Sequence, residues 1–309
     1  MQDYQHLGDG VYHLDSHYIQ PGVASLYCIV QDGEVAIIET GTARSLPYVQ
    51  KCLNDLGIAP QQVKYIMPTH VHLDHAGGAG VMMAAFPEAQ LVIHPSGARH
   101  MIDPSKLIAA TRAVYGEDVF NQIYGDIPPV DEARVIIGEH ASLVELNGRP
   151  LQIIDTPGHA YHHFCVVDET SRGIFSGDTF GLSYPNLLHN GQRVVLPTTT
   201  PTQFDPAALM KSIDLLMTFQ PERMYLTHFN ELPNPAALVD QYKSWVEKYV
   251  DLAERIKPQQ KDLPLMIEQM GKMMADEFGF SALVIGSQLS MDIKLNCQGL
   301  IYWYQKHHD

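Results

Sequence analysis

Thr69-His70-Val71-His72-Leu73-Asp74-His75 directly follows a short apolar stretch that is predicted to be a β-strand. Side chains alternate along an extended chain, so His70 and His72 are expected to point to the same side. Asp74 and His75 come where the chain turns towards two glycines and a predicted helix. Imidazole and carboxylate ligands without thiolates suit a catalytic metal ion that keeps an open coordination position. The segment therefore predicts a metal-binding active site.

Three further polar residues stand directly after predicted strands, as the first segment does. They are His159, Asp178 and His228. Loops at strand ends can be held against one site by a sheet. A lone histidine in a loop would indicate little, but this repeated context predicts that the three residues share the site with the first segment.

Composition limits the classes of protein to which the chain can belong. Its 309 residues carry 20 basic and 35 acidic side chains, a formal charge of −15, which gives no electrostatic footprint for nucleic acid or an anionic membrane. No apolar run approaches the roughly 20 residues that span a bilayer. The polar start lacks the features of a secretion signal, and the four cysteines form no CxxC pair. We therefore expect a cytoplasmic protein with a small-molecule substrate and neither a nucleic-acid partner nor membrane association. A homodimer is compatible with the sequence, which leaves the oligomeric state open.

The order of predicted elements indicates an α/β protein. Strands and helices alternate up to about residue 235, interrupted by helical pieces at about 95–128. Helices that cover packed sheets would form a sandwich. We expect a catalytic domain at residues 1–235, with the helical insertion at 95–128, and a helical C-terminal extension at residues 236–309 that covers the cleft.

These motifs, in this order, resemble the metallo-β-lactamase superfamily, which includes glyoxalase II-like thioesterases, acyl-homoserine lactonases and several nucleases. The resemblance extends over about residues 26–230. It implies a four-layered αβ/βα sandwich with two divalent metal ions per chain at one edge, between the sheets. The ligands that it implies are His70, His72 and His159 for the first ion, Asp74, His75 and His228 for the second, and Asp178 as the bridge.

The implied site suits hydrolysis by a metal-bridging hydroxide. Two ions about 3.5–4 Å apart can share a hydroxide, because each lowers the pKa of the bridging water. In the predicted mechanism Asp74 is a ligand and a proton acceptor that orients this hydroxide. No Gly-x-Ser-x-Gly segment or papain-like cysteine motif indicates another nucleophile. Imidazole-rich sites favour zinc, and a bridging carboxylate also admits iron or manganese.

Four other residues are candidates for a supporting role or for substrate contact. Glu39 stands where this superfamily commonly has aspartate, at the end of an early strand, and is expected to orient a ligand histidine. In lactonases of this superfamily a tyrosine closely follows the bridging aspartate, whereas here Tyr184 stands further along the chain from Asp178. Tyr184 is therefore expected either to contact the substrate or to pack in the core. His162 and His189 are candidates for substrate contact, with a polar turn as the alternative.

The predicted function is hydrolysis of a small ester, thioester or lactone. The acidic chain and the apolar insertion favour a partly apolar small substrate over nucleic acid. The tail has no obvious basic cluster of the kind that anchors glutathione carboxylates in glyoxalase II, which argues against a thioesterase. Three alternatives stay open: a phosphodiesterase with the same metal site, an iron-dependent oxygen-handling enzyme similar to a sulfur dioxygenase, and a non-catalytic metal-containing signalling or binding protein.

Overall fold

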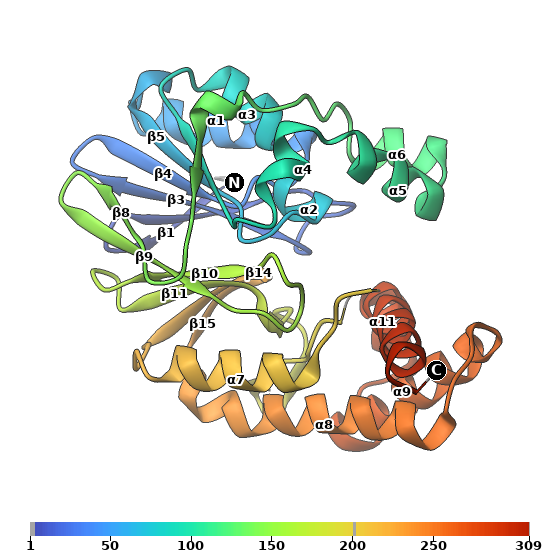
Figure 1. The fold of residues 1–309 in the computed structure, drawn as a ribbon. Coiled ribbons are helices and arrows are strands. Elements are labelled where there is room, and N and C mark those ends of the chain that lie inside the picture. Colours follow the sequence, from blue (N-terminus) through green and yellow to red (C-terminus); the bar gives the residue numbers. More distant parts are fainter. Residues whose placement is uncertain (1–3, 200–201, 309) are drawn as a thin grey trace. The chain divides into compact units, whose positions relative to one another are not determined.

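The computed structural model describes residues 4–199 and 202–308 (Figure 1). Contacts between residues divide the chain into two compact units. The first unit contains the residues up to 155 together with 162–177 and 222–233, and the second contains 156–161, 178–221 and the residues from 234 onward. Each unit therefore combines segments that are far apart in the sequence.

The first unit is built on two sheets, and the first of these is mixed. Its strand order is β1-β2-β3-β4-β5-β6-β7. The strands are β1 (Tyr4–Gly8), β2 (Val11–Asp15), β3 (Ser25–Gln31), β4 (Glu34–Ile38), β5 (Val63–Met67), β6 (Gln90–Ile93) and β7 (Val135–Ile137). Neighbours pair antiparallel from β1 to β4 and parallel from β4 to β7. Parallel strands need crossover connections, so the chain must leave the sheet after β4, β5 and β6.

Helices pack on one face of this sheet. They are α1 (Leu46–Asp55), α2 (Leu73–Ala76), α3 (Ala79–Ala85) and α4 (Ala98–Ile102), accompanied by the short 3-10 helices η1 (Ala43–Ser45), η2 (Pro60–Gln62) and η3 (Glu132–Arg134). Val49 of α1 and Met82 of α3 join Ile66 of β5 in one buried apolar core. Figure 1 shows α1 and α3 together on this side of the strands.

The second sheet supplies the other wall of the sandwich. Its strand order is β15-β14-β11-β10-β9-β8. The strands are β8 (Leu143–Leu146), β9 (Arg149–Asp155), β10 (Phe164–Asp168), β11 (Gly173–Leu182), β14 (Arg223–His228) and β15 (Asn230–Pro233). Tyr27 of the first sheet shares a buried core with Phe175 and Tyr225 of the second. The ring centroid of Tyr27 lies 5.3 Å from that of Phe175 and 5.4 Å from that of Tyr225, so aromatic packing joins the sheets.

The insertion consists of α5 (Ser105–Tyr115) and α6 (Glu117–Ile123) after α4. Phe120 and Tyr124 pack in a small apolar cluster with Tyr18 and Leu73. The hydroxyl groups of Tyr18 and Tyr124 lie 3.1 Å apart. Because Leu73 is adjacent to predicted metal ligands in the sequence, this packing anchors the insertion beside them.

The second unit is mainly helical. Its elements are β12 (Leu188–His189), β13 (Gln192–Arg193), α7 (Pro206–Met217), η4 (Pro235–Leu238), α8 (Val239–Ile256), η5 (Gln260–Asp262), α9 (Leu263–Phe278), α10 (Ala282–Gln288) and α11 (Ser290–His308). Trp245 and Tyr249 of α8 are fully buried. Helices α8, α9 and α11 contact one another, so the apolar stripe of α8 packs inside a helical layer.

The expected fold class is confirmed. The structure has two packed sheets, covering helices, a helical insertion and a helical C-terminal region. Among the helices that the structure describes, none is long and apolar enough to cross a membrane.

A buried ion pair links β9 to β10 and provides a test of this core. Arg149 Nε donates to Asp168 Oδ1 at 2.9 Å, and the two side chains are only 2% and 0% exposed. We expect Arg149→Leu to lower the free energy of unfolding by about 3–5 kcal/mol in urea denaturation, because it leaves a buried carboxylate without its cation. The control is Arg172→Leu, which breaks an exposed pair with Glu222 and should cost less than about 1 kcal/mol. Equal losses in both variants would contradict the prediction.

Candidate metal centre

The carboxylate of Glu39 organises the predicted ligands of the first unit. It is buried at the end of β4 and accepts four hydrogen bonds. The donors are the backbone N–H of Thr69 (3.1 Å), Oγ1 of Thr69 (2.6 Å), Nδ1 of His75 (3.0 Å) and Oγ1 of Thr227 (2.9 Å). These residues lie just after β5, in α2 and near the end of β14. One carboxylate thus holds together the chain segments that carry most of the predicted ligands.

The imidazoles of His75 and His228 are both held through Nδ1. His75 donates through Nδ1 to Glu39, and Nδ1 of His228 donates to the backbone carbonyl oxygen of Val23 at 3.0 Å. A carbonyl oxygen can only accept, so the proton of a neutral His228 ring is on Nδ1. In the neutral rings, the Nε2 atoms of both residues then carry lone pairs.

These lone pairs converge on Asp74. Its Oδ2 atom lies 3.5 Å from Nε2 of His75 and 3.4 Å from Nε2 of His228. Ligand atoms of the three residues all lie within 4.8 Å of one another. Three acceptor atoms directed at one point repel one another unless a cation lies among them. These three ligand atoms therefore fit a divalent metal ion, and nitrogen and oxygen ligands suit zinc, iron or manganese.

His70 and His72 lie beside this group. Oγ1 of Thr69 donates to Glu39, so it accepts from Nδ1 of His70 at 3.1 Å. Nε2 of His70 then faces Nδ1 of His72 at 2.7 Å. The ring centroids of His70 and His75 are 4.0 Å apart. The first unit thus brings five of the predicted ligands into one neighbourhood.

His159 and Asp178 lie in the second unit and are close to each other. Nε2 of His159 is 3.4 Å from Oδ2 of Asp178, and both side chains are buried. Nδ1 of His159 lies 3.2 Å from the carbonyl oxygen of Thr198, which again places the proton on Nδ1 and a lone pair on Nε2. Gly158 has φ +141°, and a Cβ there would lie 2.5 Å from the backbone nitrogen of Leu209, so the turn before His159 requires glycine.

The remaining candidates have different surroundings. The ring of His162 is nearly parallel to that of His70, with centroids 6.0 Å apart, and lies 5.6 Å from that of His72. Tyr184 donates its hydroxyl to Asp292 of α11 at 3.2 Å. Nδ1 of His189 donates to the backbone carbonyl oxygen of Phe278 in α9, also at 3.2 Å. His162 is therefore next to the predicted ligands, whereas Tyr184 and His189 contact the C-terminal helices.

Sequence reasoning missed the two threonines that bind Glu39. Thr69 and Thr227 bind Glu39. His163 is fully buried, with its ring 5.0 Å from that of His70. The signal for the threonines was present, because Thr-His ends two separate strand segments. His163 directly follows the candidate His162, and substrate contact or a polar turn is expected for it in the same way.

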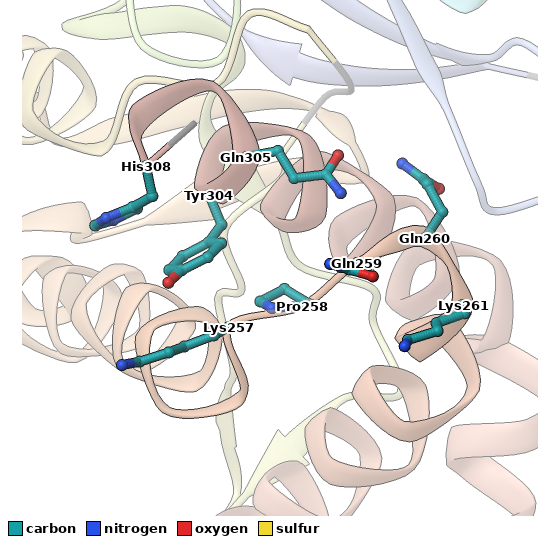
Figure 2. A pocket seen from close by; sticks show the side chains of 8 residues that line it. All are labelled: Lys257, Pro258, Gln259, Gln260, Lys261, Tyr304, Gln305 and His308. Carbon is teal, nitrogen blue, oxygen red and sulfur yellow. The ribbon is translucent and has the colours of Figure 1, made fainter.

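A separate pocket of about 440 Å³ lies in the C-terminal helical region (Figure 2). It is lined by residues 257–261 and by Tyr304, Gln305 and His308 of α11. Figure 2 shows polar side chains around it, among them Lys257 and Lys261. None of the predicted metal ligands lines this pocket, so it is not the candidate metal site.

Comparison with known proteins identifies the family. The family model of the metallo-beta-lactamase superfamily matches residues 19–228. The chain belongs to the metallo-beta-lactamase superfamily. A solved structure of an archaeal metallo-beta-lactamase superfamily protein from Sulfolobus tokodaii has the same fold, with a TM-score of 0.64, 21% identity and coverage of 95% of this chain and 98% of that chain. The family and the histidine–aspartate groups together indicate binding of divalent metal.

Three relatives are about one quarter identical where they align. A metallo-beta-lactamase fold-containing protein of Sulfurisphaera tokodaii is 25% identical over 232 residues, 74% of this chain and 80% of the relative. A hydroxyacylglutathione hydrolase of Polaromonas sp. is 26% identical over 160 residues, 51% of this chain and 49% of the relative. An acyl-coenzyme A thioesterase of Gallus gallus is 24% identical over 184 residues, 56% of this chain and 63% of the relative.

The role of Glu39 can be tested through metal affinity. Glu39→Gln keeps the size of the side chain but replaces one accepting oxygen by a donor, which disturbs the bonds to Thr69, His75 and Thr227. We expect zinc affinity, measured by competition with a chelator, to fall about 10–100-fold. Glu34→Gln on the same strand is the control and should bind zinc as the wild type does. Unchanged affinity in Glu39→Gln would show that this carboxylate does not support the ligands.

Proposed function

We propose that the chain is a metal-dependent hydrolase that releases an acyl group from a small thioester, with esters and lactones as related substrates. The observation that carries this proposal is the convergence of acceptor atoms from Asp74, His75 and His228. The names of two relatives favour the thioester: one is a hydroxyacylglutathione hydrolase and the other an acyl-coenzyme A thioesterase.

The proposed site contains two metal ions. His70, His72 and His159 would hold one ion, Asp74, His75 and His228 the other, and Asp178 would bridge them. Two arguments support this arrangement: the family pattern matches the chain up to His228, and His75, His159 and His228 all donate through Nδ1 to an oxygen atom. Each of these rings would therefore use Nε2 as its ligand atom. Zinc is the proposed metal, with iron or manganese as alternatives.

The bound ions would supply a nucleophile from water at neutral pH and polarise the carbonyl oxygen of the substrate. The residues of the chain supply the geometry. Glu39 and the Val23 carbonyl hold the rings of His75 and His228, so these rings need no reorganisation when substrate binds. The side chain of Asp74 is 21% exposed, against 1% for His75 and 10% for His228. Asp74 is thus the member of the group most open to substrate, and we assign to its carboxylate the role of proton acceptor.

A substrate panel tests the proposal. Metal-loaded protein is assayed with acyl-coenzyme A, acyl-glutathione, ester, lactone and phosphodiester substrates, and metal content is measured in parallel. We expect about two ions per chain and the highest turnover with a thioester. Turnover of the phosphodiester alone, or one iron per chain with no hydrolysis, would overturn the proposal.

The role of Asp74 is tested with the best substrate. Asp74→Asn keeps the shape of the side chain but removes its capacity to take up a proton, so we expect the turnover number to fall about 10²–10⁴-fold. Asp55→Asn, on the exposed side of α1, is the control and should leave turnover unchanged. Wild-type turnover in Asp74→Asn would remove Asp74 from the mechanism.

A further inference from the structure

Asn296 of α11 uses its whole side-chain amide to hold a loop that lies almost one hundred residues earlier. Its Oδ1 atom accepts from the backbone N–H of Thr199 at 2.7 Å, and its Nδ2 group donates to the carbonyl oxygen of Pro197 at 3.1 Å. The hydroxyl of Tyr249 on α8 lies 3.3 Å from the same Nδ2 group. Asn296 is 3% exposed, so all these bonds form out of contact with bulk water, where leaving them unmade is costly.

The backbone of α11 comes equally close to this loop. Oγ1 of Thr199 donates to the backbone carbonyl oxygen of Asn296 at 2.8 Å. Gly299 lies one helical turn further on, and a Cβ there would lie 3.0 Å from Cβ of Thr199 and closer still to its Oγ1. Residues three apart share one face of a helix, so Asn296 and Gly299 form a single docking face for the loop.

Thr198 lies between the two residues that Asn296 holds. Its carbonyl oxygen and its Oγ1 are each 3.2 Å from Nδ1 of His159. Its Oγ1 also donates to the backbone carbonyl oxygen of Asp178 at 3.1 Å. Fixing Pro197 and Thr199 thus fixes Thr198, which contacts both His159 and Asp178.

We infer that Asn296 is a positioning residue for metal binding: helix α11 sets the orientation of His159 and Asp178 through Thr198. This inference rests on the proposed role of His159 and Asp178 as metal ligands. It gives the C-terminal helices a role in ligand geometry, because the loop that contacts the two proposed ligands is bonded to α11. Residues that orient metal ligands typically affect metal affinity 10–100-fold.

The test compares two buried residues of the same helix. Asn296→Leu keeps the number and branching of the side-chain heavy atoms but makes none of the amide bonds, so the loop can shift and the His159 ring can turn. We expect the affinity for zinc, from chelator competition, to fall about 10–100-fold for at least one ion. Cys297→Ala is the matched control, since Cys297 is also buried, contacts Met270 of α9 and makes none of these bonds to the loop. It should keep wild-type affinity.

A spectroscopic readout separates positioning from loss of stability. In the cobalt(II)-substituted protein the visible absorption bands depend on ligand geometry, so they should change in Asn296→Leu and stay as in the wild type in Cys297→Ala, both measured well below their unfolding temperatures. Should Asn296→Leu fail to fold, Gly299→Ala provides the second variant. It removes no polar group but pushes Thr199 away, and the same loss of affinity and the same spectral change are expected.

The outcomes distinguish this inference from the proposed function. Wild-type zinc affinity and cobalt spectrum in folded Asn296→Leu or Gly299→Ala would overturn the inference alone. An equal loss in Cys297→Ala would also overturn it, because a general loosening of α11 would then suffice. A wild-type protein that binds neither zinc nor cobalt would overturn the proposed function together with this inference.

Discussion

The structure of the first unit depends on one buried carboxylate. A buried acceptor must be satisfied by donors, and Glu39 obtains four of them from Thr69, His75 and Thr227. These donors come from three separate segments of the chain. Satisfying the carboxylate therefore fixes the positions of those segments relative to one another, and the predicted ligand histidines are attached to them. The hydrogen bonds that offset the free-energy cost of burying Glu39 thus also define the candidate metal centre.

A common rule orients the histidines of both units. His75, His228 and His159 each donate through Nδ1 to a fixed oxygen atom, from Glu39, Val23 and Thr198 respectively. Each oxygen is held by its own environment, so ring rotation would break a buried hydrogen bond. In each unit the free-energy cost of orienting these lone pairs is therefore paid during folding rather than when a ligand binds. The same reasoning underlies the inference about Asn296, because it binds Pro197 and Thr199, which flank the Thr198 carbonyl that His159 contacts.

Much of the fold could be predicted from local patterns. Alternating and apolar runs located the strands, and helical spacing predicted the helices after residue 235, where Tyr242, Trp245 and Tyr249 form the buried stripe of α8. These predictions succeeded because periodicity reflects which face of an element is buried. The partners of Tyr184 and His189 could not be predicted in the same way. Both contact C-terminal helices about 90 to 110 residues away, and no local pattern encodes such pairs.

By itself, the sequence determined the kinds of candidate ligand, their spacing around His70 and His75, and the superfamily to which the chain belongs. Ligand chemistry and short-range spacing are properties of neighbouring residues, so they can be recognised without coordinates. Only the tertiary structure decided which nitrogen of each ring carries the proton, which oxygen accepts it, and that Thr227 binds Glu39 and Asn296 binds Thr199. Those features depend on hydrogen bonds between residues brought together by packing, and such bonds exist only once the sheets and helices have assembled.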